Sequence, residues 1–190
     1  MAVTDVNSGY LTDYARLKPS AQHRTLLAWN GLRAPPVRIF VRPVEIWRGG
    51  TRHDLPEQEL AYVADALARA VRLNLAASFE IADRPGPGVF ELRVALTHAG
   101  SDIRRHTKKG EPLGRRTGPL GLPTRNFVRV AALEAELLEP GTGRSAAMVM
   151  DRKAADEIPK GAPDSWEDVF HAFSLWGERL RTVFQSAGSL

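Results

Sequence analysis

An amphipathic stretch over residues 55–77 constrains the fold of this chain more than any other feature. Its apolar residues recur every three or four positions, with charged residues between them: Leu60, Ala64, Leu67, Val71 and Leu75. This spacing predicts one long helix with a single apolar stripe. Such a helix needs an apolar surface to pack on, because its stripe is unfavourable in water.

A second stripe of the same period lies near the end of the sequence and predicts a second helix. Gly177 stands within this stripe. Glycine in a helix interior costs about 1 kcal/mol relative to alanine, so we expect a close contact at this position. The buried residues of this helix are expected to be Val169, Phe173, Trp176, Leu180 and Phe184.

Between the two predicted helices, apolar and polar residues alternate in several short runs. The clearest cover residues 37–47 and 90–97, and a shorter one covers residues 79–82. Residues 127–150 favour a β-hairpin with its turn at Pro140 to Gly143, although the first half alone also favours a helix. We therefore expect an α+β fold: a mixed, mostly antiparallel sheet with two main helices packed on one face, in the order arm, strand, helix, strands, helix.

The first 36 of the 190 residues differ in character from the rest. Turn-forming pairs such as Asn30-Gly31 and Pro35-Pro36 alternate with aromatic residues. Because a disordered tail is poorer in aromatic residues, we predict that residues 1–36 form an arm packed on a single α+β domain, residues 37–190. Four aromatic residues are expected to pack at this contact rather than form an exposed recognition patch: Tyr10, Tyr14, Trp29 and Trp47.

A basic excursion at residues 98–126 interrupts the predicted domain. Glycine and proline break any periodicity there, so we expect a long loop. It carries seven basic and two acidic residues, an excess of five, whereas the whole chain has a net charge of +4. The candidate anion- or partner-binding residues are Arg104, Arg105, Lys108, Lys109, Arg115, Arg116 and Arg125. A solvated loop without a specific ligand is the competing interpretation.

Known catalytic and cofactor-binding patterns are missing from the sequence. There is no cysteine, which excludes disulfides and thiol catalysis. The five histidines do not occur at metal-binding spacings, and no serine nucleophile motif is present. Glu134 and Glu136 share one strand face, and we predict that both are exposed to solvent. We therefore expect no enzyme, catalytic residue, metal or cofactor, although a site assembled by folding from distant residues stays open.

Several short segments carry a family resemblance along nearly the whole chain. The most specific is Ser8-Gly9-Tyr10-Leu11-x-Asp13-Tyr14-x-x-Leu17-Lys18-Pro19. Weaker segments are Pro43-Val44-Glu45, Pro85-Gly86-Pro87-Gly88, Glu134 to Gly143, and Trp176 to Leu180. In this order they resemble an uncharacterised family of bacterial envelope lipoproteins, the domain of unknown function thirty-three-thirteen.

The resemblance implies a non-enzymatic envelope domain that acts in binding or assembly of a protein, an anionic polymer or a lipid headgroup. Family precursors carry a signal peptide and a lipobox cysteine. The sequence has neither, so it is expected to be the mature soluble part. The implied location is the periplasmic face of the outer membrane, with an acyl anchor before Ala2.

The residues alone leave a further alternative open, a basic cytosolic protein that binds anions or nucleic acid through residues 98–126. The segment has no aromatic residue on which single-stranded bases could stack, so nucleic acid is the less favoured ligand.

Overall fold

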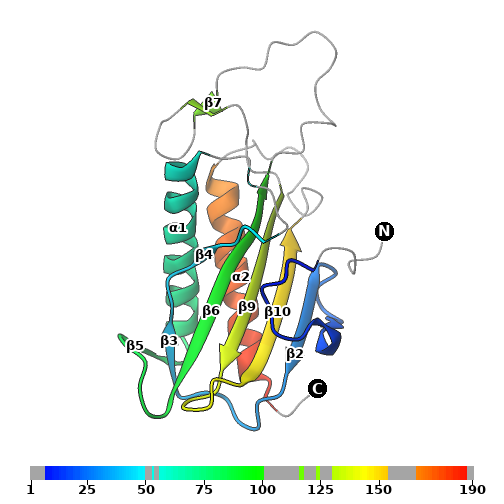
Figure 1. Ribbon diagram of the computed structural model, residues 1–190, viewed down its shortest axis with the longest axis vertical. Coiled ribbons are helices and arrows are strands. Elements are labelled where there is room, and N and C mark those ends of the chain that lie inside the picture. Colours follow the sequence, from blue (N-terminus) through cyan, green and yellow to red (C-terminus); the bar gives the residue numbers. More distant parts are fainter. Residues whose placement is uncertain are drawn as a thin grey trace.

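The computed structural model describes residues 7–49, 53, 56–100, 116–117, 123–124, 130–153 and 166–187. In this part of the chain, two long helices stand beside one large sheet (Figure 1). The helices are α1 (Glu57–Ala76) and α2 (Trp166–Gln185). The strands are β1 (Lys18–Pro19), β2 (Leu26–Asn30), β3 (Arg38–Val41), β4 (Glu45–Ile46), β5 (Glu80–Ala82), β6 (Val89–Gly100), β7 (Arg116–Thr117), β8 (Pro123–Thr124), β9 (Val130–Leu138) and β10 (Ser145–Lys153).

The large sheet is mixed and mostly antiparallel, as predicted. Its strand order is β1-β2-β10-β9-β6-β3-β5, and β4 pairs with β6 beyond the end of β3. Strands β6, β9 and β10 form an antiparallel centre, whereas β3 and β4 run parallel to β6. The β9–β10 pair confirms the predicted hairpin. The predicted strand 37–47 is divided into β3 and β4, because Pro43 between them has no N–H to donate to a ladder.

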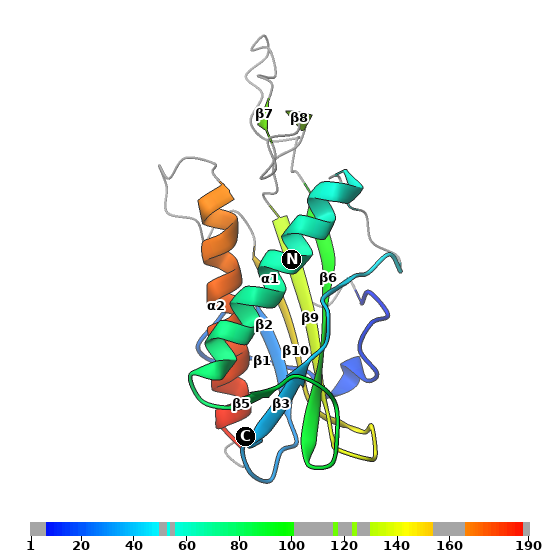
Figure 2. The same ribbon diagram turned by 90° about the vertical axis from the view of Figure 1, so that its left-hand side faces the viewer.

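Both helices pack on the same face of the sheet (Figures 1 and 2). The predicted stripes form the main core: Leu67, Val71 and Leu75 of α1 are fully buried, as are Phe173 and Trp176 of α2. They pack on apolar side chains that β3, β6 and β9 direct to this face. No described helix is both long enough and apolar enough to span a lipid bilayer.

Gly177 lies where the two helices touch, as the sequence predicts. A Cβ atom at this position would stand 2.9 Å from the Cβ atom of Asn74 and 3.0 Å from the carbonyl oxygen of Ala70. Both atoms belong to or adjoin the backbone of α1 and have little freedom to move. The helices can therefore approach this closely only because residue 177 has no side chain.

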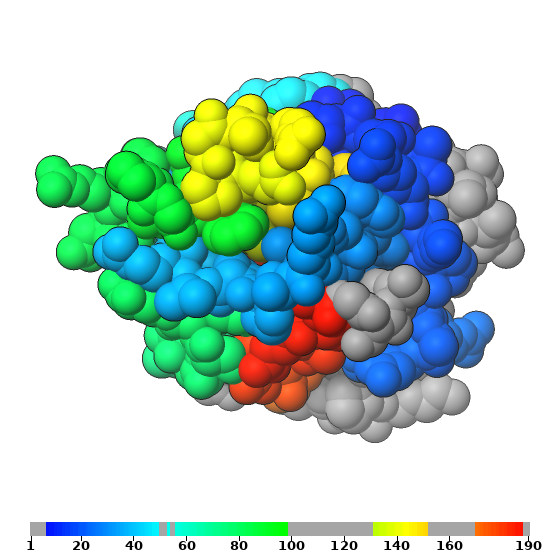
Figure 3. Space-filling model, turned by 90° about the horizontal axis from the view of Figure 1, so that it is seen from below, coloured from blue at the N-terminus to red at the C-terminus, as the bar shows by residue number. Residues whose placement is uncertain are grey.

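The opposite face of the sheet is covered by residues 7–17, which we call the N-terminal strap. Figure 2 shows the strap (blue) and the two helices on opposite sides of the sheet. Seen from below in Figure 3, the end of α2 (red) and the β9–β10 turn (yellow) are likewise separated by the chain that leads into β3 (light blue). A second, smaller core lies beneath the strap: Tyr10, Leu11, Ala95, Met148 and Met150.

Candidate functional site

The sheet face beneath the strap carries two buried carboxylates, Glu134 and Glu136. Both side chains leave β9 on the same side, because side chains alternate along a strand. Their relative exposures are 1% and 0%, so the prediction that they face solvent is wrong. Their spacing showed that they share a face, but it did not show that the start of the chain lies across that face.

The strap is folded around the hydroxyl oxygen of one of its own residues, Tyr14. The backbone N–H groups of Tyr10 and Leu11 donate to this oxygen at 2.9 and 3.1 Å, and the hydroxyl oxygen of Ser8 lies 3.2 Å from it. Gly9 makes the curve possible because its φ of 81° lies in the left-handed region. The most specific sequence segment thus builds one compact local structure.

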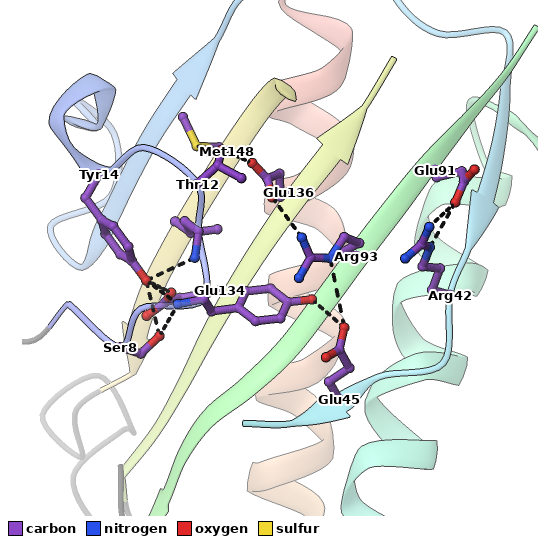
Figure 4. A network of polar contacts seen from close by, with 12 residues as sticks. Ser8, Thr12, Tyr14, Arg42, Glu45, Glu91, Arg93, Glu134, Glu136 and Met148 are labelled. Carbon is purple, nitrogen blue, oxygen red and sulfur yellow. Dashed lines mark hydrogen bonds and ion pairs between the residues drawn. The ribbon is translucent and has the colours of Figure 1, made fainter. Parts of the chain in front are cut away.

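Two hydroxyl groups of the strap donate hydrogen bonds to the two buried carboxylates (Figure 4). The Tyr14 hydroxyl donates to Oε2 of Glu134, and the Thr12 hydroxyl donates to Oε1 of Glu136. Hydrogen bonds to an ionised acceptor are stronger than neutral ones, and a buried carboxylate without them is unfavourable. The strap therefore stabilises the buried Glu134 and Glu136, and these two carboxylates in turn hold the strap on the sheet.

Arg93 on β6 brings a positive charge to this cluster. Its Nη1 lies 3.4 Å from Oε2 of Glu136, and its Nε lies 4.0 Å from Oε1 of Glu45 on β4. The guanidinium stacks over the ring of Tyr10, 4.8 Å from the ring centroid, in a cation–π contact. The Tyr10 hydroxyl also donates to Glu45 at 3.1 Å. Arg93 thus links the strap to three strands of the sheet.

Aromatic side chains hold the strap at both of its ends. At one end, the indole N–H of Trp47 donates to the carbonyl oxygen of Ser8 at 2.8 Å, and its ring meets Tyr10 edge-on with centroids 5.3 Å apart. At the other end, the guanidinium of Arg16 lies 4.8 Å from the centroid of the Trp29 ring. All four aromatic residues singled out in the sequence therefore contact or belong to the strap.

Burial raises the pKa of both tyrosines in the strap above that of an exposed phenol, so their hydroxyl groups stay protonated further into the alkaline range than those of exposed tyrosines. For Tyr10 the next cause is the negative charge of Glu45, and for Tyr14 it is the hydrogen bond to Glu134. The site is thus a set of donors already matched to acceptors. Such an arrangement fastens the strap to the sheet.

Most of the predicted anion-binding residues lie outside the part of the chain that the structure describes: Arg104, Arg105, Lys108, Lys109, Arg115 and Arg125. Arg116 falls in β7, which pairs with β8. Over the described ranges, no three histidine, aspartate or glutamate side chains are grouped so that they could hold a metal ion.

Sequence reasoning did not identify Thr12, Arg93, Glu134 and Glu136 as one cluster, yet one signal pointed to it. Residues 146–150 of β10 are apolar at every position. A strand that is apolar on both faces is typically covered on both. Because Met150 pairs with Glu134 and Met148 with Glu136, the glutamates share the face whose cover this pattern predicts.

Comparisons with solved structures found distant similarity to two bacterial proteins. The PelC dodecamer from Paraburkholderia phytofirmans is 13% identical with a TM-score of 0.41, and the match covers 85% of this chain and 96% of that one. Protein XCC0632 from Xanthomonas campestris is 16% identical with a TM-score of 0.42, and the match covers 82% and 95%. A comparison with curated proteins found no match.

A comparison with protein-family models gave a match that includes the strap, α1, most of α2 and every strand of the large sheet. The matched segment runs from residue 6 to residue 180. The chain therefore belongs to the family described as "Protein of unknown function (DUF3313)".

Proposed function

We propose that this chain is the mature, soluble part of a bacterial envelope lipoprotein that acts in binding or assembly and not as an enzyme. Its partner is an envelope protein, or an anionic polymer or lipid headgroup, at the periplasmic face of the membrane. An acyl chain attached before the strap anchors it, with the outer membrane as the proposed location.

The observation that carries this proposal is that Glu134 and Glu136 accept hydrogen bonds from the strap. Glu134 and Glu136 are neighbouring buried carboxylates on one strand face, and both accept hydrogen bonds from hydroxyl groups of the strap. Their role is therefore to fasten the N-terminal segment to the sheet. An attachment through defined side-chain contacts at this end suits a domain whose anchor lies on the N-terminal side.

The basic excursion supports an anionic partner. The charge excess of residues 98–126 exceeds that of the whole chain, so the rest of the protein is close to neutral. Lysine and arginine side chains attract phosphate and carboxylate groups over about one Debye length. Replacing Arg104, Arg105, Arg115 and Arg116 by alanine should therefore weaken binding to an acidic polymer and make it less sensitive to salt.

The proposed acyl anchor and envelope location can be tested by labelling the native full-length gene product in cells with a fatty-acid probe and then fractionating the cells. Labelled protein in the envelope fraction would support the proposal and direct crosslinking to the basic excursion. Unlabelled protein in the cytosol would refute it. The basic anion-binding protein would then become the leading function.

A further inference from the structure

The strap contacts the sheet through side chains and not through a strand ladder. Among the described residues, no backbone–backbone hydrogen bond joins residues 7–17 to the sheet. Ladder pairing begins only at Lys18, which lies opposite Ala28. Leu17, whose N–H bonds back to the carbonyl oxygen of Tyr14 at 3.2 Å, is thus the last residue before the chain becomes part of the sheet.

The strap is also held together internally. The bonds from the N–H groups of Tyr10 and Leu11 to the Tyr14 hydroxyl lie wholly within it. These bonds do not depend on the sheet, so they can persist when the strap leaves it. The segment can therefore move as one unit, and it need not lose its own structure first.

The surface beneath the strap is polar at its centre. When the strap lifts, water can replace the hydroxyl groups of Thr12 and Tyr14 as donors to Glu136 and Glu134. Exchange of one hydrogen-bond partner for another costs much less than leaving a carboxylate unpaired. The polar centre therefore makes lifting easier than it would be over a wholly apolar surface.

We propose that residues 7–17 form a releasable strap, hinged at Leu17, that opens as a unit and uncovers the Glu134–Glu136 face of the sheet. Because the strap turns about Leu17 as a unit, opening moves Asn7 away from the sheet and lengthens the connection between the domain and whatever precedes it. The inference that the strap opens depends on contacts within the chain. Only its consequence, a longer reach for a membrane-anchored domain, rests on the proposed function.

Spin labels can measure the opening directly in the full chain. The sequence has no cysteine, so the double variant Asn7→Cys with Leu73→Cys carries a spin label only at these two positions. One label lies on the strap and the other at an exposed position on α1. Leu73→Cys with Thr142→Cys gives a reference pair within the domain. The test variant is Thr12→Val with Glu134→Gln, which removes the charged acceptor but keeps the Tyr14 hydroxyl oxygen that the strap's own N–H groups need. The control is Tyr62→Phe, which removes a hydroxyl group from α1.

Each lost hydrogen bond to a carboxylate should raise the open population by about tenfold. We expect longer distances for the strap pair in the test variant, with the reference pair and the Tyr62→Phe control unchanged. Met148 and Met150 are 1% and 4% exposed beneath the strap, so their oxidation by peroxide should accelerate together in the test variant.

Two results would overturn the proposal. Unchanged distances and oxidation rates in the test variant would show that the hydrogen bonds from Thr12 and Tyr14 to the two carboxylates do not hold the strap. Simultaneous broadening of the strap pair and the reference pair would show that the strap and the domain unfold together. Both readouts concern the isolated chain, so they are independent of whether the protein is acylated in the cell.

Discussion

Replacing Arg93 by methionine should destabilise the fold markedly, because it leaves the carboxylate of Glu136 buried without its cation. The Glu136 side chain is 0% exposed, and that of Arg93 is 24% exposed. Breaking a fully buried pair costs about 3–5 kcal/mol. Because water reaches part of Arg93, we expect about 2–3 kcal/mol here. For a chain of this length, that lowers the Tm by roughly 4–12 °C.

Urea unfolding followed by circular dichroism measures this change. Arg42→Met is the matched control: Arg42 Nε lies 2.9 Å from Glu91, but the two side chains are 43% and 28% exposed, so its loss should cost less than about 1 kcal/mol. Adding Glu136→Gln to Arg93→Met should restore stability, because no buried charge then lacks a partner. The reasoning would be refuted if Arg93→Met and Arg42→Met lowered the free energy of unfolding equally. It would also be refuted if the double variant were less stable than Arg93→Met alone.

Two further predictions concern the helix contact and the strap. Gly177→Ala should lower the free energy of unfolding by about 1 kcal/mol in urea, because the clash with Asn74 outweighs the gain in helix propensity; higher stability would mean that the helices can move apart. The free energy of unfolding should stay constant up to about pH 10, the pKa of an exposed tyrosine, and fall above it. Above this pH the tyrosines of the unfolded chain lose their phenol protons, whereas the buried Tyr10 and Tyr14 of the folded chain keep theirs. Urea midpoints at rising pH test this, and an unaltered decline after Tyr10→Phe would contradict it.

The sequence predicted well those elements whose pattern repeats within a short segment. The stripes of α1 and α2 are periodic over several turns, so their existence and their buried faces follow from local spacing alone. The hairpin at residues 130–153 was harder, because its first half is rich in alanine and leucine, which favour a helix. The turn at Pro140 to Gly143 decided in favour of the hairpin, and the positive φ of Gly141 and Gly143 agrees with that choice.

The cluster under the strap could not be predicted in the same way, since it joins segments far apart in the sequence. Thr12 and Glu136 are separated by 124 positions, and no local period connects them. A glutamate on a strand is usually solvated, and only the arrival of hydroxyl donors from another segment makes its burial tolerable. That requirement is a property of the assembled fold and not of the strand.

The position of β2 sets an order on how the chain can fold during synthesis. Trp29 of β2 pairs with Met148 of β10, so β1 and β2 can pair only with each other until the last quarter of the chain is available. Contacts between such distant segments form slowly, because a long loop must close first. A nascent chain would keep β1 and β2 separate from the rest of the sheet for most of its synthesis. Any transport machinery that accepts only extended polypeptide could therefore engage that end before the sheet has closed on it.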